Sequence, residues 1–335
     1  MAAEWSKALR LIGIVLLIFA CLETIAMTIS VEGAVVVECG RETAMPPTPY
    51  MEMLGQILGA SASGILLNYD NDYVRRVSRK FTRADLKRLF LGMVVSGGSV
   101  YDRGGKYCIR FYGKDYTLHK VFSGLAYELY QASPSTLHIS DRNTYVTQLY
   151  CKDAVVEIKE LSPETNQRKG GAPTIAYITE GDRSVREESI RVIMSVSGWI
   201  NLSFRHGPHG FVVYPKLGLG ASIPARLCEE YQILTESLSL NFKSYADKRY
   251  KGTSYLMTCS NEVCRRFLEL GGFLDGNTIK KGRFAGKEKN TLLRSVLTLG
   301  GKTFRSIEDA GKAVETAFCN SNFELSALLG RLILG

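Results

Sequence analysis

Two long apolar runs dominate the pattern of hydrophobic and polar positions along the chain. The first, Leu89 to Val100, reads LFLGMVVSGGSV, and the second, Ile190 to Ile200, reads IRVIMSVSGWI. Each run passes through small residues and a glycine, Gly98 or Gly198, and these glycines are 100 residues apart. Behind each glycine the apolar period changes to the alternation of a strand. We therefore expect each run to be a buried helix that leads straight into a β-hairpin.

The elements predicted after the two runs follow the same order. In the first copy they are a strand at Lys106–Gly113, a helix at Tyr116–Gln131, strands at Ser135–Ser140 and Thr144–Tyr150, and a helix at Asp153–Leu161. In the second copy they are a strand at Phe211–Leu219, a helix at Pro224–Ser239, strands at Leu240–Ala246 and Ser254–Cys259, and a helix at Asn261–Leu270. The shared order is α-β-β-α-β-β-α, which predicts an internal duplication of an α+β unit.

The remaining segments frame this duplication. Thr82 and Asp85 have the spacing of a capping box, which predicts a helix start before the first apolar run. Turn and charged residues fill 162–189, as is typical of a linker, with one strand predicted at Thr174–Thr179. The domain boundaries that we expect are an N-terminal extension at 1–50, a first repeat at 81–161, the linker at 162–189, a second repeat at 190–275 and a basic, mainly helical tail at 276–335.

On these motifs the chain resembles the LAGLIDADG homing endonucleases in their single-chain, two-repeat form. The resemblance covers residues 81–275 and implies a duplicated αββαββα fold with two antiparallel sheets that form a saddle over DNA. It also implies that the two motif helices pack together along a pseudo-twofold axis, so that a monomer contains an internal pseudo-dimer. Small residues would let these helices approach each other, and the candidates are Gly92, Ser96, Gly97, Gly98, Ser195, Ser197 and Gly198.

The first strand after each apolar run supplies candidate contacts to double-stranded DNA. Alternation along Lys106–Gly113 sends Ile109 and Phe111 to one face and Arg110 and Tyr112 to the other. Two-stranded ribbons fit the major groove, where arginine and lysine reach guanine acceptors. The residues predicted to contact DNA are Arg103, Lys106, Arg110, Tyr112, Lys114, Arg205, Tyr214 and Lys216.

The resemblance fails at the catalytic positions. The next-to-last motif residue of each helix is an acid in the active family, and the acid pair holds the divalent metal ions. Here that position falls at Gly97 and at Ser197, and no acid occurs between Lys87 and Tyr101 or between Arg191 and Arg226. We therefore predict a DNA-binding protein with a degenerate active site, no catalytic residues, no metal ligands and no cofactor. The alternative is an active endonuclease that uses Mg²⁺ through other residues.

Composition adds a charge argument and a redox argument. Residues 81–275 hold 25 basic and 20 acidic residues, and residues 276–335 hold 10 and 5, so both parts suit a polyanionic partner. The eight cysteines show no spacing typical of a zinc site. Reduced thiols in an intracellular, cytoplasmic protein are the favoured interpretation.

The N-terminal segment leaves three interpretations open. Lys7 and Arg10 precede twelve uncharged residues, 11–22, a layout that is typical of a signal peptide and short for a membrane span. The segment is a targeting signal, a membrane anchor, or translated upstream sequence with the true start at Met45, Met51 or Met53. A DNA-binding core favours the third interpretation, or a cryptic anchor. A membrane-anchored binding protein is therefore a further alternative function.

Overall fold

The computed structural model describes residues 71–163 and 173–334. The predictions made for the extension at 1–50, including an anchor at 11–22, lie outside the described residues, as does part of the linker. Among the residues that are described, no helix has both the length and the apolar character needed to cross a membrane.

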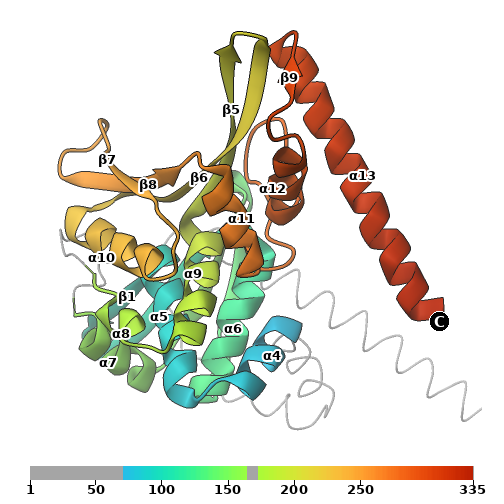
Figure 1. Ribbon diagram of the computed structural model, residues 1–335. Helices are drawn as coiled ribbons and strands as arrows, with labels where there is room; N and C mark the ends of the chain where they lie inside the picture. Colours follow the sequence, from blue (N-terminus) through green and yellow to red (C-terminus); the bar gives the residue numbers. More distant parts are fainter. Residues whose placement is uncertain (1–70, 164–172, 335) are drawn as a thin grey trace, which may run out of the picture. The chain divides into compact units, whose positions relative to one another are not determined.

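Each half of the described chain contains the predicted succession of elements (Figure 1). The first half consists of α5 (Arg83–Gly97), β1 (Gly98–Arg103), β2 (Lys106–Gly113), α6 (Tyr116–Tyr130), β3 (Ser135–Ile139), β4 (Thr144–Leu149) and α7 (Lys152–Leu161). The second half consists of α9 (Arg183–Ser197), β5 (Gly198–Gly207), β6 (Gly210–Pro224), α10 (Ala225–Glu236), β7 (Lys243–Ala246), β8 (Thr253–Thr258) and α11 (Asn261–Glu269).

Strand pairing is the same in both halves. The first sheet has the order β1-β2-β4-β3 and the second the order β5-β6-β8-β7, and all pairs are antiparallel. The predicted α+β fold, a duplicated αββαββα arrangement, is therefore confirmed. In the second half, β6 runs on past the predicted end at Leu219 to Pro224, after a register shift between Leu219 and Ile223.

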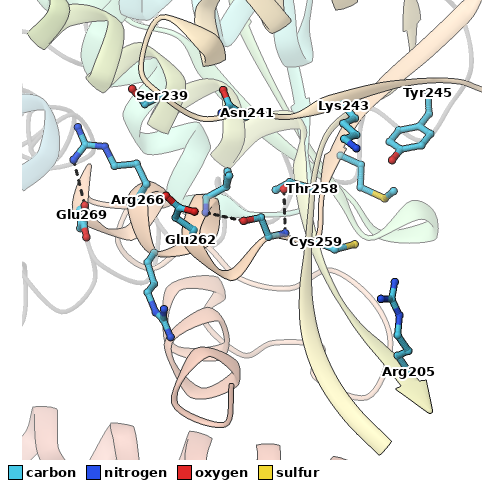
Figure 2. A pocket seen from close by; sticks show the side chains of 14 residues that line it. Arg205, Ser239, Asn241, Lys243, Tyr245, Thr258, Cys259, Glu262, Arg266 and Glu269 are labelled. Carbon is cyan, nitrogen blue, oxygen red and sulfur yellow. Dashed lines mark hydrogen bonds and ion pairs between the residues drawn. The ribbon is translucent and has the colours of Figure 1, made fainter. Parts of the chain in front are cut away.

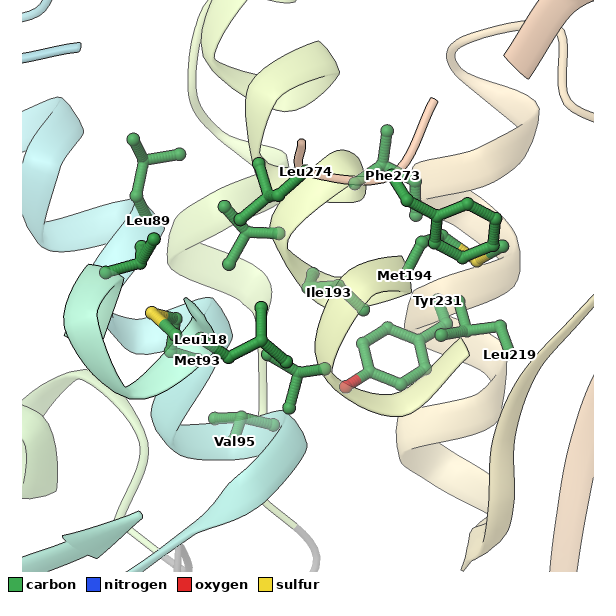
Figure 3. Close-up of a cluster of buried hydrophobic side chains, with 14 of the residues drawn as sticks. Leu89, Met93, Val95, Leu118, Ile193, Met194, Leu219, Tyr231, Phe273 and Leu274 are labelled. Carbon is green, nitrogen blue, oxygen red and sulfur yellow. The ribbon is translucent and has the colours of Figure 1, made fainter. Parts of the chain in front are cut away.

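The two motif helices, α5 and α9, pack against each other as predicted. Thr82 and Asp85 form the capping box that starts α5, since the Thr82 hydroxyl accepts from the Asp85 amide. A Cβ atom built on Gly92 would lie 3.3 Å from Cγ1 of Ile193, so Gly92 lets the helices approach closely. Figure 3 shows Met93 of α5 with Ile193 and Met194 of α9 in one buried cluster.

Not every small residue of the motifs serves this contact. The Ser96 hydroxyl lies 3.0 Å from the hydroxyl of Tyr231 on α10. The Ser195 hydroxyl donates to the Arg191 carbonyl at 2.7 Å and accepts from the Leu274 amide at 2.7 Å. Ser96 and Ser195 therefore also form hydrogen bonds with buried polar groups outside the contact between α5 and α9.

The prediction of a strand at Thr174–Thr179 is wrong, because this segment contains a short helix, α8 (Ala176–Thr179). The Thr174 hydroxyl accepts from the Ala176 amide at 3.1 Å, which turns the chain before the helix. Ile175 and Ile178 are both fully buried and are three residues apart, so they share one face of the turn. A three-residue spacing of apolar positions suits a helical turn and not the period of a strand.

The helical tail predicted after residue 276 packs against the duplicated core. It contains α12 (Lys289–Thr298) and α13 (Ile307–Leu334), with a short strand, β9 (Thr303–Phe304), between them that pairs with β6. Before the duplicated core, α4 (Asp72–Lys80) buries Val74 and Val77. The helix α4 packs against α5 and α6, whereas α12, α13 and β9 contact β6 of the second sheet.

Candidate nucleic-acid interface

The first sheet has an apolar inner face and a polar outer face. Ile109, Phe111 and Leu149 are fully buried on the inner face, where the ring of Phe111 stacks on Phe122 of α6 at 5.0 Å. The register pairs Ser99 with Arg110 and Arg103 with Lys106, which places these residues on the opposite face. Four predicted residues therefore share this outer face: Arg103, Lys106, Arg110 and Tyr112. Lys114 follows the strand and is exposed.

One residue of this outer face differs from the expected pattern. Cys108 lies two residues before Arg110 on β2 and therefore on the same face, yet it is only 5% exposed. Burial raises the pKa of its thiol. The outer face is therefore partly covered by its own side chains, and only its longer polar residues reach solvent.

The second sheet repeats the arrangement. Its register pairs Asn201 with Lys216, Ser203 with Tyr214 and Arg205 with Val212, so the predicted Arg205, Tyr214 and Lys216 lie on one face. The opposite face carries the buried Val213, Leu217 and Leu219.

Sequence reasoning missed three further residues on this face of the second sheet. Trp199 pairs with Gly218, and a Cβ atom on Gly218 would lie 2.0 Å from the indole, which therefore covers that glycine. Lys243 and Tyr245 of β7 pair with Met257 and Tyr255 of β8, which places them on the same face. The alternation of Lys243 and Tyr245 was the signal that could have found them.

An arginine stacks on a tyrosine in each sheet. The guanidinium of Arg110 lies 4.8 Å from the ring centroid of Tyr101, and that of Arg205 lies 5.8 Å from the ring centroid of Tyr214. In the first sheet the tyrosine is on β1 and the arginine on β2, whereas in the second sheet the arginine is on β5 and the tyrosine on β6. Stacking holds each guanidinium against its sheet, and the Nε atom of Arg110 is buried there without a hydrogen-bond partner.

A pocket of about 770 Å³ lies beside the second sheet (Figure 2). Arg205 and Lys243 reach it from the strands, and Arg266 and Glu269 of α11 form an ion pair at 3.2 Å along its wall. Ser260, whose hydroxyl accepts from the Val263 amide at 3.3 Å, caps the start of α11 and also lines the pocket. The pocket therefore continues the basic face of the second sheet toward α11.

The two catalytic positions of the resemblance lie at the ends of the paired helices. A Cβ atom on Gly97 would lie 2.6 Å from Cγ1 of Val196 and 2.9 Å from Cε2 of Phe111. The Ser197 hydroxyl donates to the Ile193 carbonyl at 3.1 Å. Within the described ranges, no three histidine, cysteine, aspartate or glutamate side chains gather in a group that could hold a metal ion.

Two lysines of the tail lie beside the second of these positions, and sequence reasoning missed both. The ammonium of Lys289 donates to the Gly198 carbonyl at 2.9 Å, and that of Lys280 donates to the Val196 carbonyl at 3.5 Å. These two carbonyls flank Ser197. Lys289 is only 3% exposed, whereas Lys280 is exposed. No local pattern distinguishes them from the other basic residues that open the tail.

Comparisons with known proteins identify similar folds and no close relative. No protein-family model and no curated protein matches the chain. Among the similar solved structures is I-DmoI in complex with DNA and Ca, at 12% identity and a TM-score of 0.41, over 56% of this chain and 90% of that chain. The LAGLIDADG meganuclease I-AabMI bound to uncleaved DNA is 10% identical with a TM-score of 0.43, over 68% of this chain and 96% of that chain.

A third similar structure is full-length DUF199/WhiA from Thermatoga maritima. It is 13% identical with a TM-score of 0.41, over 70% of this chain and 66% of that chain. The class of fold rests on the chain's own duplicated αββαββα topology and paired sheets. In that topology the chain resembles the LAGLIDADG homing endonucleases.

Proposed function

We propose that this protein binds double-stranded DNA across the outer faces of its two sheets and does not cleave it. Residues 81–161 and 190–275 are the two DNA-contacting repeats in this proposal, and residues 276–335 are a cap on the core. The molecule acts as a monomer that contains an internal pseudo-dimer. Its partner is the DNA duplex, and no metal ion or other cofactor takes part.

The observation that carries this proposal is the distribution of side chains on the two sheets. Each sheet buries an apolar face against helices and presents basic and aromatic side chains on the other face. Lysine and arginine on such a face neutralise phosphates, and stacked guanidinium groups are ordered before binding. The repetition of an arginine–tyrosine stack in both halves supports a shared role for the two faces.

The lack of cleavage follows from the residues at the helix ends. Mg²⁺ prefers carboxylate oxygens and gives up its water ligands reluctantly. Gly97 has no side chain and Ser197 uses its hydroxyl within α9. Backbone carbonyls and one hydroxyl cannot hold a divalent ion firmly enough to activate water at a phosphate.

Replacing Arg110 and Arg205 together by alanine is expected to weaken DNA binding and to reduce its salt dependence. Each lost phosphate contact lowers the slope of log K against log salt by about 0.9. Fluorescence anisotropy with a labelled duplex at several salt concentrations measures both quantities. Arg226→Ala is the matched control, because Arg226 is an exposed arginine on α10 and α10 covers the inner face of the second sheet. A double variant with the wild-type slope would contradict the proposed interface.

Purified wild-type protein is expected to shift duplex DNA in a gel and to leave supercoiled plasmid uncut with Mg²⁺ or Mn²⁺. The physical reason is the lack of a fixed acid pair at Gly97 and Ser197. Metal-dependent nicking that disappears on mutation of residues near the two helix ends would instead establish the alternative, an active endonuclease.

A further inference from the structure

One row of residues crosses all four strands on the outer face of the second sheet. The strand register aligns Trp199 on β5, Gly218 on β6, Met257 on β8 and Lys243 on β7. A Cβ atom on Gly218 would lie 2.0, 2.1 and 2.7 Å from three atoms of the Trp199 indole. The indole therefore lies over Gly218 on the outer face, and a side chain at position 218 would displace it.

Two tyrosines lie next to this row on the same face. Tyr245 on β7 and Tyr255 on β8 are directly opposite each other, and each is two residues from a member of the row. Their ring centroids are 5.6 Å apart and their planes differ by 19°, so the rings stack. Tyr245 remains 38% exposed. We call Trp199, Tyr245 and Tyr255 the aromatic platform.

A pocket of about 640 Å³ opens over the aromatic platform. All three aromatic side chains line it, together with Met257 and with the basic residues Lys216, Lys248 and Arg249. Ligand pockets of about 300 to 1,000 Å³ are typical of small-molecule sites, so this volume is sufficient for a single nucleotide. The pocket thus combines flat apolar surface with positive charge.

The acid among the described lining residues of this pocket is already occupied. Asp247 accepts from Nε of Arg249 at 3.0 Å and from a terminal nitrogen of Arg249 at 2.8 Å, and it also accepts from the Ser222 hydroxyl at 2.6 Å. Within the described ranges, neither Lys216 nor Lys248 forms an ion pair. The pocket therefore has a positive surplus that favours an anionic ligand.

The equivalent positions of the first sheet carry different side chains. There the row consists of Ser99, Arg110, Gln148 and Ser135. The pair that corresponds to the two tyrosines is Leu137 with Val146. Arginine and glutamine suit the hydrogen-bonding edges of bases, whereas aromatic rings suit base faces. The aromatic platform therefore belongs to one half of the molecule and indicates a separate task.

We propose that the aromatic platform stacks against one unpaired nucleobase that has turned out of the bound DNA duplex. This inference rests on the proposed DNA binding and adds a structural feature of the DNA that is recognised. In an intact duplex the neighbouring base pairs cover the base faces, and the grooves expose only base edges. Ring faces on the protein therefore match a base that has left the stack, and the basic side chains attract the strand that carries it.

The cost of turning out a base determines which DNA binds best. This cost is smallest for a base that has no pairing partner. A duplex with a single-nucleotide bulge is therefore expected to bind the wild-type protein about tenfold more tightly than the same duplex without the bulge. Fluorescence anisotropy with labelled duplexes, in which the bulge occupies successive positions, measures this preference.

Tyr245→Leu is the test variant, because leucine keeps an apolar side chain at position 245 and removes the ring. It is expected to lose the preference for the bulged duplex and to bind the paired duplex as the wild type does. Tyr116→Leu is the matched control. Tyr116 is 40% exposed and lies 5.1 Å from the ring of Tyr145, but it belongs to α6 on the inner side of the first sheet.

The outcomes separate this inference from the proposed function. No preference in the wild type, or an unchanged preference in Tyr245→Leu, would overturn the stacked base, while binding of the paired duplex would still support the proposed function. Binding of a single-stranded oligonucleotide that depends on Tyr245, without binding of any duplex, would support the aromatic platform and reject the proposed function. Absence of binding to every one of these DNA molecules would reject both.

Tryptophan fluorescence provides a direct measurement of the contact. The chain has two tryptophans, Trp5 and Trp199, so Trp5→Phe leaves Trp199 as the single indole. Stacking on a base quenches indole emission, and the bulged duplex is therefore expected to quench Trp199 strongly while the paired duplex does not. Equal quenching by both duplexes at saturation would show that no base stacks on the platform and would overturn the inference.

Discussion

The free energy of unfolding of the wild-type protein is expected to rise, relative to a Lys289→Met variant, by about 1.4 kcal/mol per pH unit above pH 7. Burial lowers the pKa of Lys289 from 10.5 to about 7, and the neighbouring Lys280 lowers it further while Asp115 partly opposes this shift. The unfolded chain returns the amine to its ordinary pKa. Between pH 7 and pH 10.5 the unfolded state therefore binds more protons, and stability increases with pH.

Urea denaturation of both proteins at several pH values between about pH 6 and pH 9 measures this difference. Below pH 7 the amine is protonated in both the folded and the unfolded state, so the difference in unfolding free energy becomes constant. Lys120→Met, which removes an exposed amine, should follow the wild type at every pH. Wild-type and Lys289→Met stabilities that change in parallel would show that the buried amine keeps an ordinary pKa.

Gly97→Asp is expected to destabilise the protein by about 3 kcal/mol or more, whereas Ser197→Asp is expected to cost less than about 1 kcal/mol. The new Cβ at position 97 would lie 2.6 Å from Val196 and 2.9 Å from Phe111. Phe111 is fully buried and stacked on Phe122, so it cannot move aside cheaply. At position 197 a carboxylate would instead have the amines of Lys280 and Lys289 nearby, and it would favour the protonated form of both.

Urea unfolding of the two single variants at pH 7 tests this asymmetry. Gly92→Ala is a useful comparison, because its Cβ would lie 3.3 Å from Ile193 and requires only a small adjustment of the helix pair. Similar stabilities for Gly97→Asp and Ser197→Asp would contradict the crowding that we describe. The expected result also means that placing acids at both positions does not by itself create a metal site.

The duplicated fold could be predicted because its signals are local. The capping box at Thr82 and Asp85, the glycine after each apolar run and the alternation along Lys106–Gly113 each depend on neighbouring residues. The wrong prediction at Thr174–Thr179 falls where the local signal is ambiguous, because β-branched residues typical of strands occur there with the three-residue spacing of Ile175 and Ile178. Tertiary burial of both side chains decided in favour of the helical turn.

The candidate interface could be predicted only in part. Register follows from alternation, so the shared faces of Arg110 with Tyr112 and of Arg205 with Lys216 were accessible from the sequence. The role of Lys289 could not be predicted from the sequence, because its partner carbonyl belongs to Gly198, far away along the chain. Among the basic residues at the start of the tail it has no distinguishing neighbour. Only the folded chain shows that this amine is buried.

The tail contacts the two halves of the duplicated molecule differently. Asn277 and Thr278 hydrogen-bond to Asp115 in the first half, while Lys289 hydrogen-bonds to Gly198 in the second. In a symmetric homodimer of one repeat, both halves would make the same contacts. Here one tail segment contacts the two halves through different residues, so the molecule is asymmetric. A duplex on the two sheets would meet the lysines at the end of one motif helix, α9, and a crowded glycine at the end of the other. We therefore expect the preferred DNA sequence to be non-palindromic and to bind in one orientation.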